Sequence, residues 1–162
     1  MKNTAIIYAS THHGNTKKLV EAIAGKYPVT LIDAERTTKA DLSGFDLIGF
    51  ASGIDFGRFY PSVEAFIREN LPEKKDVFFL YTCARTSNRF TRTIREETAR
   101  KSATVLGEYG CRGFNTYGPW KLIGGMNKGH PNSAEIAQAI AFDCIIDAMM
   151  QSKPAFSEVH PS

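Results

Sequence analysis

Short apolar segments alternate with amphipathic helical patterns along nearly the whole chain, and this alternation limits the folds open to it. The apolar segments are rich in β-branched and aromatic residues, which is typical of strands buried on both faces. Strands are predicted over residues 4–9, 28–33, 45–52, 76–82 and 111–116. Helices are predicted over residues 14–26, 61–70, 91–107 and 132–151. Buried strands that alternate with helices form a parallel sheet covered on both faces, so we expect a doubly wound α/β fold.

The chain has 162 residues, a length that favours one domain. We expect this domain to span residues 1–151 and residues 152–162 to form a C-terminal tail. The last helix should be capped by Asn132 or Ser133. Its apolar stripe is expected to consist of Ile136, Ile140, Ala141, Ile145 and Met149. The irregular, glycine-rich stretch 117–130 contains the only tryptophan, Trp120, and a loop of that length is usually functional.

The first predicted strand leads into a helix through a loop rich in hydroxyl groups. Ligands of parallel sheets bind beyond the carboxyl ends of the strands, and the free amides at a helix N-terminus attract anions. We therefore expect a phosphate to bind here, where Gly14 lets the backbone approach closely. The alternative is that the hydroxyl residues only cap the helix and Gly14 only makes a turn. The candidate residues are Ser10, Thr11, His12, His13, Gly14, Asn15 and Thr16.

The segment from Tyr8 to Thr16 resembles the flavodoxin phosphate loop, Ser/Thr-x-Thr-Gly-x-Thr after the first strand. The resemblance extends over most of the chain in length, element order and loop position. It implies a flavodoxin-like five-stranded parallel sheet of order 2-1-3-4-5 that binds flavin mononucleotide, FMN. The dinucleotide pattern G-x-G-x-x-G and the P-loop pattern G-x-x-x-x-G-K-[ST] are both missing, as expected for a cofactor with one terminal phosphate. The sequence departs from the family at His13, which stands where threonine is usual.

The resemblance assigns the loop after the third strand to one face of the flavin ring. Ile54 and Phe56 are the expected apolar wall, and the peptide joining Gly57 to Arg58 is the one expected to respond to the redox state. Arg58 replaces an acidic residue common in the family, and a cation there favours the reduced, anionic flavin. The alternative is an ordinary turn with Phe56 in the core. The candidate residues are Ser52, Gly53, Ile54, Asp55, Phe56, Gly57 and Arg58.

The resemblance assigns the loop after the fourth strand to the pyrimidine edge of the flavin. Backbone groups are its expected contacts, and Phe90 is the aromatic candidate for the outer ring face. Cys83 has no partnered histidine that the sequence identifies, so we expect a buried, reduced thiol and no nucleophile. We predict no catalytic residue and no metal site. The candidate cofactor-binding residues are Thr82, Cys83, Ala84, Arg85 and Phe90.

The formal net charge is +3, and arginines cluster between Arg85 and Arg100. Such a stretch can steer an acidic partner or can simply be a solvated helix face. No nucleic-acid motif accompanies the charge, and no apolar run is long enough for a membrane span. The N-terminus lacks a signal-peptide pattern, so we expect a cytoplasmic protein, and its oligomeric state is left open.

Two classes of function follow from the resemblance. The first is an FMN-binding electron carrier between partner oxidoreductases, in which the flavin supplies the chemistry. The second is a flavin-dependent oxidoreductase of the protoporphyrinogen dehydrogenase type, because the Gly-x-x-Phe-Gly-Arg-Phe-Tyr core within residues 51–66 is similar to those enzymes. Its carboxylated substrate would be held by the arginines. A third possibility is a binding module that has the same fold but binds no flavin.

Overall fold

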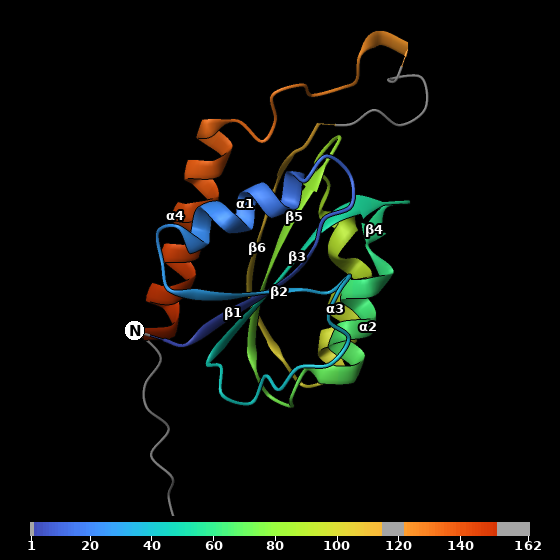
Figure 1. Ribbon diagram of the computed structural model, residues 1–162. Helices are drawn as coiled ribbons and strands as arrows, with labels where there is room; N and C mark the ends of the chain where they lie inside the picture. The colour runs from blue at the N-terminus through green and yellow to red at the C-terminus, as the bar shows by residue number, and fades with distance from the viewer. Residues whose placement is uncertain (1, 115–121, 152–162) are drawn as a thin grey trace, which may run out of the picture.

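The central element of the computed structural model, which describes residues 2–114 and 122–151, is a twisted sheet of parallel strands (Figure 1). The strand order is β2-β1-β3-β5-β6, which is the expected order 2-1-3-4-5 once the short β4 is set aside. β4 pairs antiparallel with the end of β3 and forms a hairpin. The strands are β1 (Thr4–Ala9), β2 (Val29–Asp33), β3 (Leu47–Asp55), β4 (Arg58–Phe59), β5 (Asp76–Cys83) and β6 (Thr104–Arg112).

Helices cover both faces of the sheet (Figure 1), which confirms the predicted doubly wound architecture. α1 and α4 pack on one face, and α2 and α3 pack on the other. The helices are α1 (Asn15–Ala24), α2 (Pro61–Asn70), α3 (Arg92–Ala99) and α4 (Ser133–Gln151), with a short 3-10 helix η1 (Asn88–Thr91) before α3. None of these described helices is long and apolar enough to cross a membrane.

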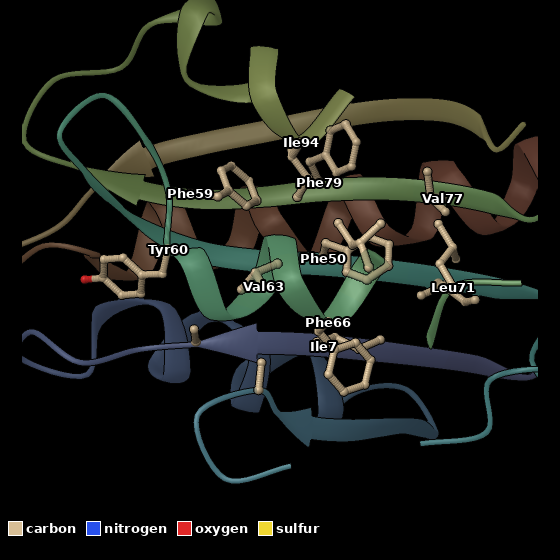
Figure 2. Packing of buried hydrophobic residues seen from close by; sticks show 14 of the residues in the cluster. Ile7, Phe50, Phe59, Tyr60, Val63, Phe66, Leu71, Val77, Phe79 and Ile94 are labelled. Atoms are coloured by element: carbon tan, nitrogen blue, oxygen red, sulfur yellow. The ribbon is translucent and has the colours of Figure 1, made fainter. Parts of the chain in front are cut away.

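The core consists of two apolar layers, one on each side of the sheet. Because side chains alternate along a strand, Ile7, Phe50 and Phe79 face α2 and α3, whereas their neighbours Ile6 and Phe78 face α1 and α4. Figure 2 shows the first layer, in which Phe66 of α2 and Ile94 of α3 lie over the strands. The three central strands are buried almost throughout, as their unbroken apolar runs predicted.

The prediction was wrong in the region of α3 and β6. The helix predicted over 91–107 ends at Ala99, and Ser102 adopts a left-handed φ of 52° that turns the chain. The last strand begins at Thr104, well before the predicted start at Cys111. β6 is an edge strand, half exposed and paired only with β5, so it lacks the apolar run of a central strand. Its Gly110 is required by packing, because a Cβ there would lie 2.1 Å from the Tyr81 ring.

The apolar stripe predicted for α4 is also corrected. The helix buries Ala139, Asp143, Ile146 and Met150, whereas two of the expected residues, Ala141 and Met149, are exposed. Ile136 and Ile140 are partly buried against the core, and the side chain of Ile145 lies outside the described part of the chain. Asn132 caps the helix as expected, since its Oδ1 accepts from Glu135 N at 2.9 Å. Trp120 and the tail 152–162 lie outside the described residues.

Candidate functional site

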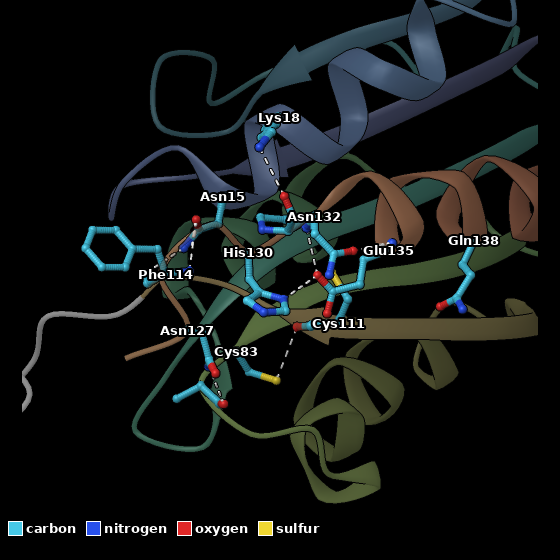
Figure 3. Close-up of polar contacts among 12 residues, drawn as sticks. Asn15, Lys18, Cys83, Cys111, Phe114, Asn127, His130, Asn132, Glu135 and Gln138 are labelled. Carbon is cyan, nitrogen blue, oxygen red and sulfur yellow. Dashed lines mark hydrogen bonds and ion pairs between the residues drawn. The ribbon is translucent and has the colours of Figure 1, made fainter. Parts of the chain in front are cut away.

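The loops that follow β1, β3, β5 and β6 meet at one edge of the sheet, because parallel strands all end on the same side (Figure 1). Specific side chains bind these loops together. The amide of Asn15, at the start of α1, donates to Phe114 O at 2.8 Å and accepts from Phe114 N at 3.2 Å (Figure 3). The amide of Asn127 donates to Ala84 O at 2.7 Å. Segments far apart in the sequence therefore form one continuous edge.

The loop after β1 presents an open helix N-terminus. His13 and Gly14 have left-handed φ values of 56° and 65°, and the first intrahelical bond runs from Lys18 N to Gly14 O. Ser10 Oγ accepts from Lys17 N at 3.1 Å, so this hydroxyl satisfies one amide of the first helical turn. Within the described chain, the amides of Asn15 and Thr16 have no hydrogen-bond acceptor. Such amides at the positive end of a helix dipole are suited to an anion.

Thr16 and Asn15 of the predicted phosphate loop use their side-chain polar groups within the protein. Thr16 is 1% exposed, and its hydroxyl lies 2.8 Å from the hydroxyl of Thr82 on β5. The side-chain amide of Asn15 is hydrogen-bonded to the backbone of Phe114. The side chains of Thr11, His12 and His13 are exposed on the loop, and the His13 ring lies 4.4 Å from that of Phe114. The loop thus offers backbone amides and exposed side chains, with Thr16 beneath them.

The base of the hairpin is held by a residue that the sequence analysis did not select. Tyr60 N donates to the buried Ser52 hydroxyl at 2.9 Å, and the Tyr60 side chain is hydrogen-bonded to Thr11. Burial raises the pKa of Tyr60, and the bond to Thr11 opposes that rise. A Cβ at Gly53 would lie 2.6 Å from the Tyr60 hydroxyl, so this glycine makes room for the tyrosine. In the sequence, the aromatic residue directly before Pro61, at the start of α2, could have indicated this role.

The tip of the hairpin is a two-residue turn. Ile54 pairs with Phe59 and Asp55 with Arg58, and the turn residues Phe56 and Gly57 have φ values of 48° and 76°. Two left-handed residues define a type I′ turn, which a bulky side chain at the first position disfavours. Phe56 is 87% exposed, so the alternative that places it in the core is wrong.

The charge of Arg58 is balanced inside the protein. Its guanidinium forms two bonds to the carboxylate of Glu64 on α2, one of them from Nε to Oε1 at 3.0 Å. The Glu64 side chain is 2% exposed, whereas that of Arg58 is 48% exposed. The cation expected at this position is therefore paired, and the ion pair reduces its field at the flavin site.

The five residues predicted in the loop after β5 differ in how far they are buried. Thr82 and Cys83 are buried at the end of the strand, and burial raises the pKa of Cys83 to about 12. A thiol with that pKa is a poor nucleophile at neutral pH, as expected. Arg85 is exposed, and Ala84 lies half-buried between it and the strand. Phe90 packs with its ring edge-on to Tyr81, at 6.0 Å between centroids, and is partly buried against the core.

The described part of the long segment before α4 is attached to this edge. Phe114 N donates to His130 O at 3.0 Å, and Lys18 Nζ donates to Pro131 O at 3.0 Å (Figure 3). In contrast, Leu122 and Ile123 are 89% and 72% exposed. Across the described residues, no cluster of His, Cys, Asp or Glu could hold a metal ion.

The comparisons with known proteins agree with this architecture. The flavodoxin domain model matches residues 5–113. An uncharacterised protein of Methanocaldococcus jannaschii is 34% identical over 139 residues, which cover 85% of this chain and 93% of the relative. A flavodoxin from the domain Archaea has a TM-score of 0.61 at 15% identity, covering 91% of this chain and 99% of that one. A Lactobacillus acidophilus flavoprotein in complex with FMN has a TM-score of 0.54 at 18% identity, covering 69% and 93%. Since the family model matches more than half of its length, the chain belongs to the flavodoxin domain family.

Proposed function

We propose that this protein binds FMN at the carboxyl edge of its sheet and carries electrons between partner oxidoreductases. One observation carries the proposal: the N-terminus of α1 lies at the same edge as the β3–β4 hairpin and the loop after β5. The amides of Asn15 and Thr16 there have no acceptor among the described residues. An anion site next to two loops that could flank a flat ring is the arrangement that a flavin nucleotide requires.

The residues of the loop after β1 fit a single terminal phosphate. An added Cβ at Gly14 would meet no heavy atom within 4 Å, so the space over the loop is open. The loop from Ser10 to Thr16 carries no acidic side chain, and its histidines would strengthen the attraction when protonated. In the proposal the phosphate is held by the amides of the loop and by the hydroxyls of Ser10 and Thr11. Thr16 supports the loop from below through Thr82.

The ring of the cofactor is assigned to the space between the hairpin and the loop after β5. Ile54 and the exposed Phe56 supply apolar surface, and the backbone around Ala84 supplies polar groups. When bound, FMN would supply the capacity to accept and donate electrons. The protein's own part is to bind the cofactor, to orient it and to limit its contact with water. The buried Cys83, with its high pKa, supports a role without a protein nucleophile.

A flavin-dependent oxidoreductase of the protoporphyrinogen dehydrogenase type, acting on a carboxylated substrate, is the second candidate. One observation favours it, namely that Leu122 and Ile123 expose apolar side chains in the segment before α4. The carrier is preferred because Asn127 and His130 anchor the described part of that segment to neighbouring loops. An anchored segment is less suited to opening and closing over a substrate. A cytoplasmic location is part of the proposal, since carriers of this kind serve soluble partners.

The test begins with the absorbance spectrum of the purified protein and the mass of the extracted cofactor. FMN is the expected result, whereas flavin adenine dinucleotide or the lack of any flavin after reconstitution would overturn the proposal. The reduced protein is then mixed with an oxidised electron-transfer protein. In parallel, the oxidised protein is mixed with protoporphyrinogen and an excess of an electron acceptor such as a quinone. Rapid electron transfer to the electron-transfer protein, with no oxidation of protoporphyrinogen, supports the carrier, whereas steady oxidation of protoporphyrinogen supports the second candidate.

A further inference from the structure

Four cations near the candidate flavin site have no acidic partner within the described residues. Most other arginines of the protein are neutralised locally by glutamates, as in the pairs Arg58–Glu64, Arg68–Glu97 and Arg95–Glu108. The loops after β5 and β6 and the segment before α4 differ, because residues 83–90, 109–114 and 122–130 contain no aspartate or glutamate. We call their four unpaired cations the basic edge, which consists of Arg85, Arg89, Arg112 and Lys128.

Hydrogen bonds join the chain segments that carry three of these cations. Gly113 N donates to Cys83 O at 2.9 Å, and Asn127 Nδ2 donates to Ala84 O at 2.7 Å. Arg112 is the neighbour of Gly113, Lys128 is the neighbour of Asn127, and Arg85 follows Ala84 directly. Arg112 is also the register partner of Cys83. The three chain segments that carry the cations are therefore within hydrogen-bond distance of each other.

The other half of the carboxyl edge carries both acidic residues and cations. Asp33 ends β2, Glu35 follows it, and Asp55 ends β3. Asp33 pairs with Arg36, and Arg58 pairs with Glu64, so the cations on this side are neutralised. The cations beside β5 and β6 have no such partner among the described residues. An excess of positive charge on one side gives a field that orients an approaching macromolecule.

We propose that the basic edge is the docking surface for an acidic electron-transfer protein, one whose carboxylates surround its redox centre. This inference rests on the proposed function, because docking beside the flavin would shorten the path of the electron. Exposed arginines hold a single carboxylate weakly in water, but several on one face raise the rate of encounter with a surface of opposite charge.

The test compares two triple variants that lose the same number of charges. The first is Arg85→Gln/Arg112→Gln/Lys128→Gln. The matched control is Lys26→Gln/Lys74→Gln/Lys101→Gln, whose lysines lie in the turns before β2, β5 and β6, at the opposite edge of the sheet. The probe is a clostridial-type ferredoxin, which is strongly acidic, and basic cytochrome c is the counter-probe. Binding is measured by NMR titration or calorimetry, with flavin-loaded and flavin-free protein.

We expect the wild type and the control to bind ferredoxin with a Kd that rises at least about tenfold between low and physiological salt. The basic-edge variant should bind about tenfold more weakly at low salt, with little salt dependence. The proposal would be overturned if both variants bound ferredoxin equally weakly, or if neither bound it more weakly than the wild type. It would also be overturned if the wild type bound cytochrome c, or duplex DNA tested as a further probe, more tightly than ferredoxin. The absence of flavin would contradict only the proposed function, since the docking measurement does not require it.

Discussion

Arg58 and Glu64 form a two-point ion pair in which the acid is buried and the base is half exposed. The pair joins the β3–β4 hairpin to the first turn of α2, so it fixes the hairpin relative to the core. Removing the arginine should therefore destabilise the protein more than removing the glutamate does, because an unpaired charge costs far more when it is buried than when water can hydrate it.

The first prediction is that Arg58→Ala destabilises the protein more than Glu64→Gln does. The arginine variant leaves the Glu64 carboxylate buried without its partner, and we expect a loss of about 3 kcal/mol in the free energy of unfolding. The Glu64→Gln variant leaves a half-exposed guanidinium that water can solvate, so the loss should be about 1 kcal/mol. Urea titration of both variants and of the double variant measures the difference. Equal losses would contradict the asymmetry.

The second prediction concerns the reduction potential of the bound flavin. Glu64→Gln removes the carboxylate that balances Arg58, so the full positive charge acts on the reduced, anionic flavin. At an effective dielectric constant of about 20, a unit charge about 8 Å away contributes about 2 kcal/mol. For one electron this corresponds to about 90 mV before screening by salt.

We therefore expect the potential of the Glu64→Gln variant to rise, and to rise more at low salt than at high salt. A spectroelectrochemical titration at two salt concentrations measures the shift. Glu35→Gln is the control, since Glu35 is exposed at the end of β2 and bonds to Ser62. A potential that falls in the Glu64→Gln variant would refute the prediction.

The third prediction distinguishes the roles of Thr16 and Ser10 in the phosphate loop. Thr16→Val leaves the buried Thr82 hydroxyl without its partner, so stability should fall by about 1–3 kcal/mol. Adding Thr82→Val should restore much of that loss, because both polar groups are then gone. In Ser10→Ala, FMN binding should weaken by about 1.5–3 kcal/mol, the range for a hydrogen bond to a charged group. Calorimetric FMN binding and urea titration of each variant provide the two readouts.

The fourth prediction concerns the space that Gly53 leaves for Tyr60. Gly53→Ala places a Cβ 2.6 Å from the tyrosine hydroxyl, so the ring must shift and its interaction with Thr11 should weaken. We expect a loss of about 1–3 kcal/mol in stability and weaker FMN binding. Tyr60→Phe keeps the ring and removes only the hydroxyl, so it should reproduce the binding defect with a smaller loss of stability. Wild-type FMN affinity in both variants would show that Tyr60 does not support the loop.

The sequence predicted the elements that are buried on both faces and missed those whose identity depends on distant partners. β1, β3 and β5 were evident as apolar runs because both of their faces lie under helices. β6 was misplaced because it is half exposed at the edge and carries Gly110 to accommodate a ring on the neighbouring strand. The loop between β1 and α1 was placed correctly, since a strand followed by a helix fixes it locally. The β3–β4 hairpin was not predicted, because the strand expected to end at Ser52 continues to Asp55 and turns back through β4.

The partners of the site residues were not predictable in the same way. Glu64 resembles a surface glutamate in the sequence, and only the folded hairpin makes it the counter-ion of Arg58. Asn15 and Phe114 are 99 residues apart, and no local pattern connects them. Such contacts arise from tertiary packing, which periodicity and capping signals do not describe.

The last prediction concerns Asp143, whose carboxyl is 6% exposed on α4, at the end of the sheet opposite to the candidate flavin site. Among the described residues its Oδ1 has no hydrogen-bond partner. It lines a cavity of about 50 Å³ with Lys2, Tyr27, Cys144 and Asp147. Burial, with a smaller contribution from the charge of Asp147, raises the pKa of Asp143 from 3.8 to about 6.

The folded state therefore favours the protonated acid. The stabilisation from this group is complete below pH 4 and is lost as the pH rises through about 6. Asp143→Asn keeps the shape and cannot ionise, so it should be more stable than the wild type by about 1–3 kcal/mol at pH 8 and about equal to it at pH 4. Urea titrations at both pH values test this, with the exposed Glu73→Gln as control. A variant that loses stability at pH 8 would mean that the carboxylate has a favourable partner in solution, with Lys2 in the same cavity as the nearest cation to examine by Lys2→Gln.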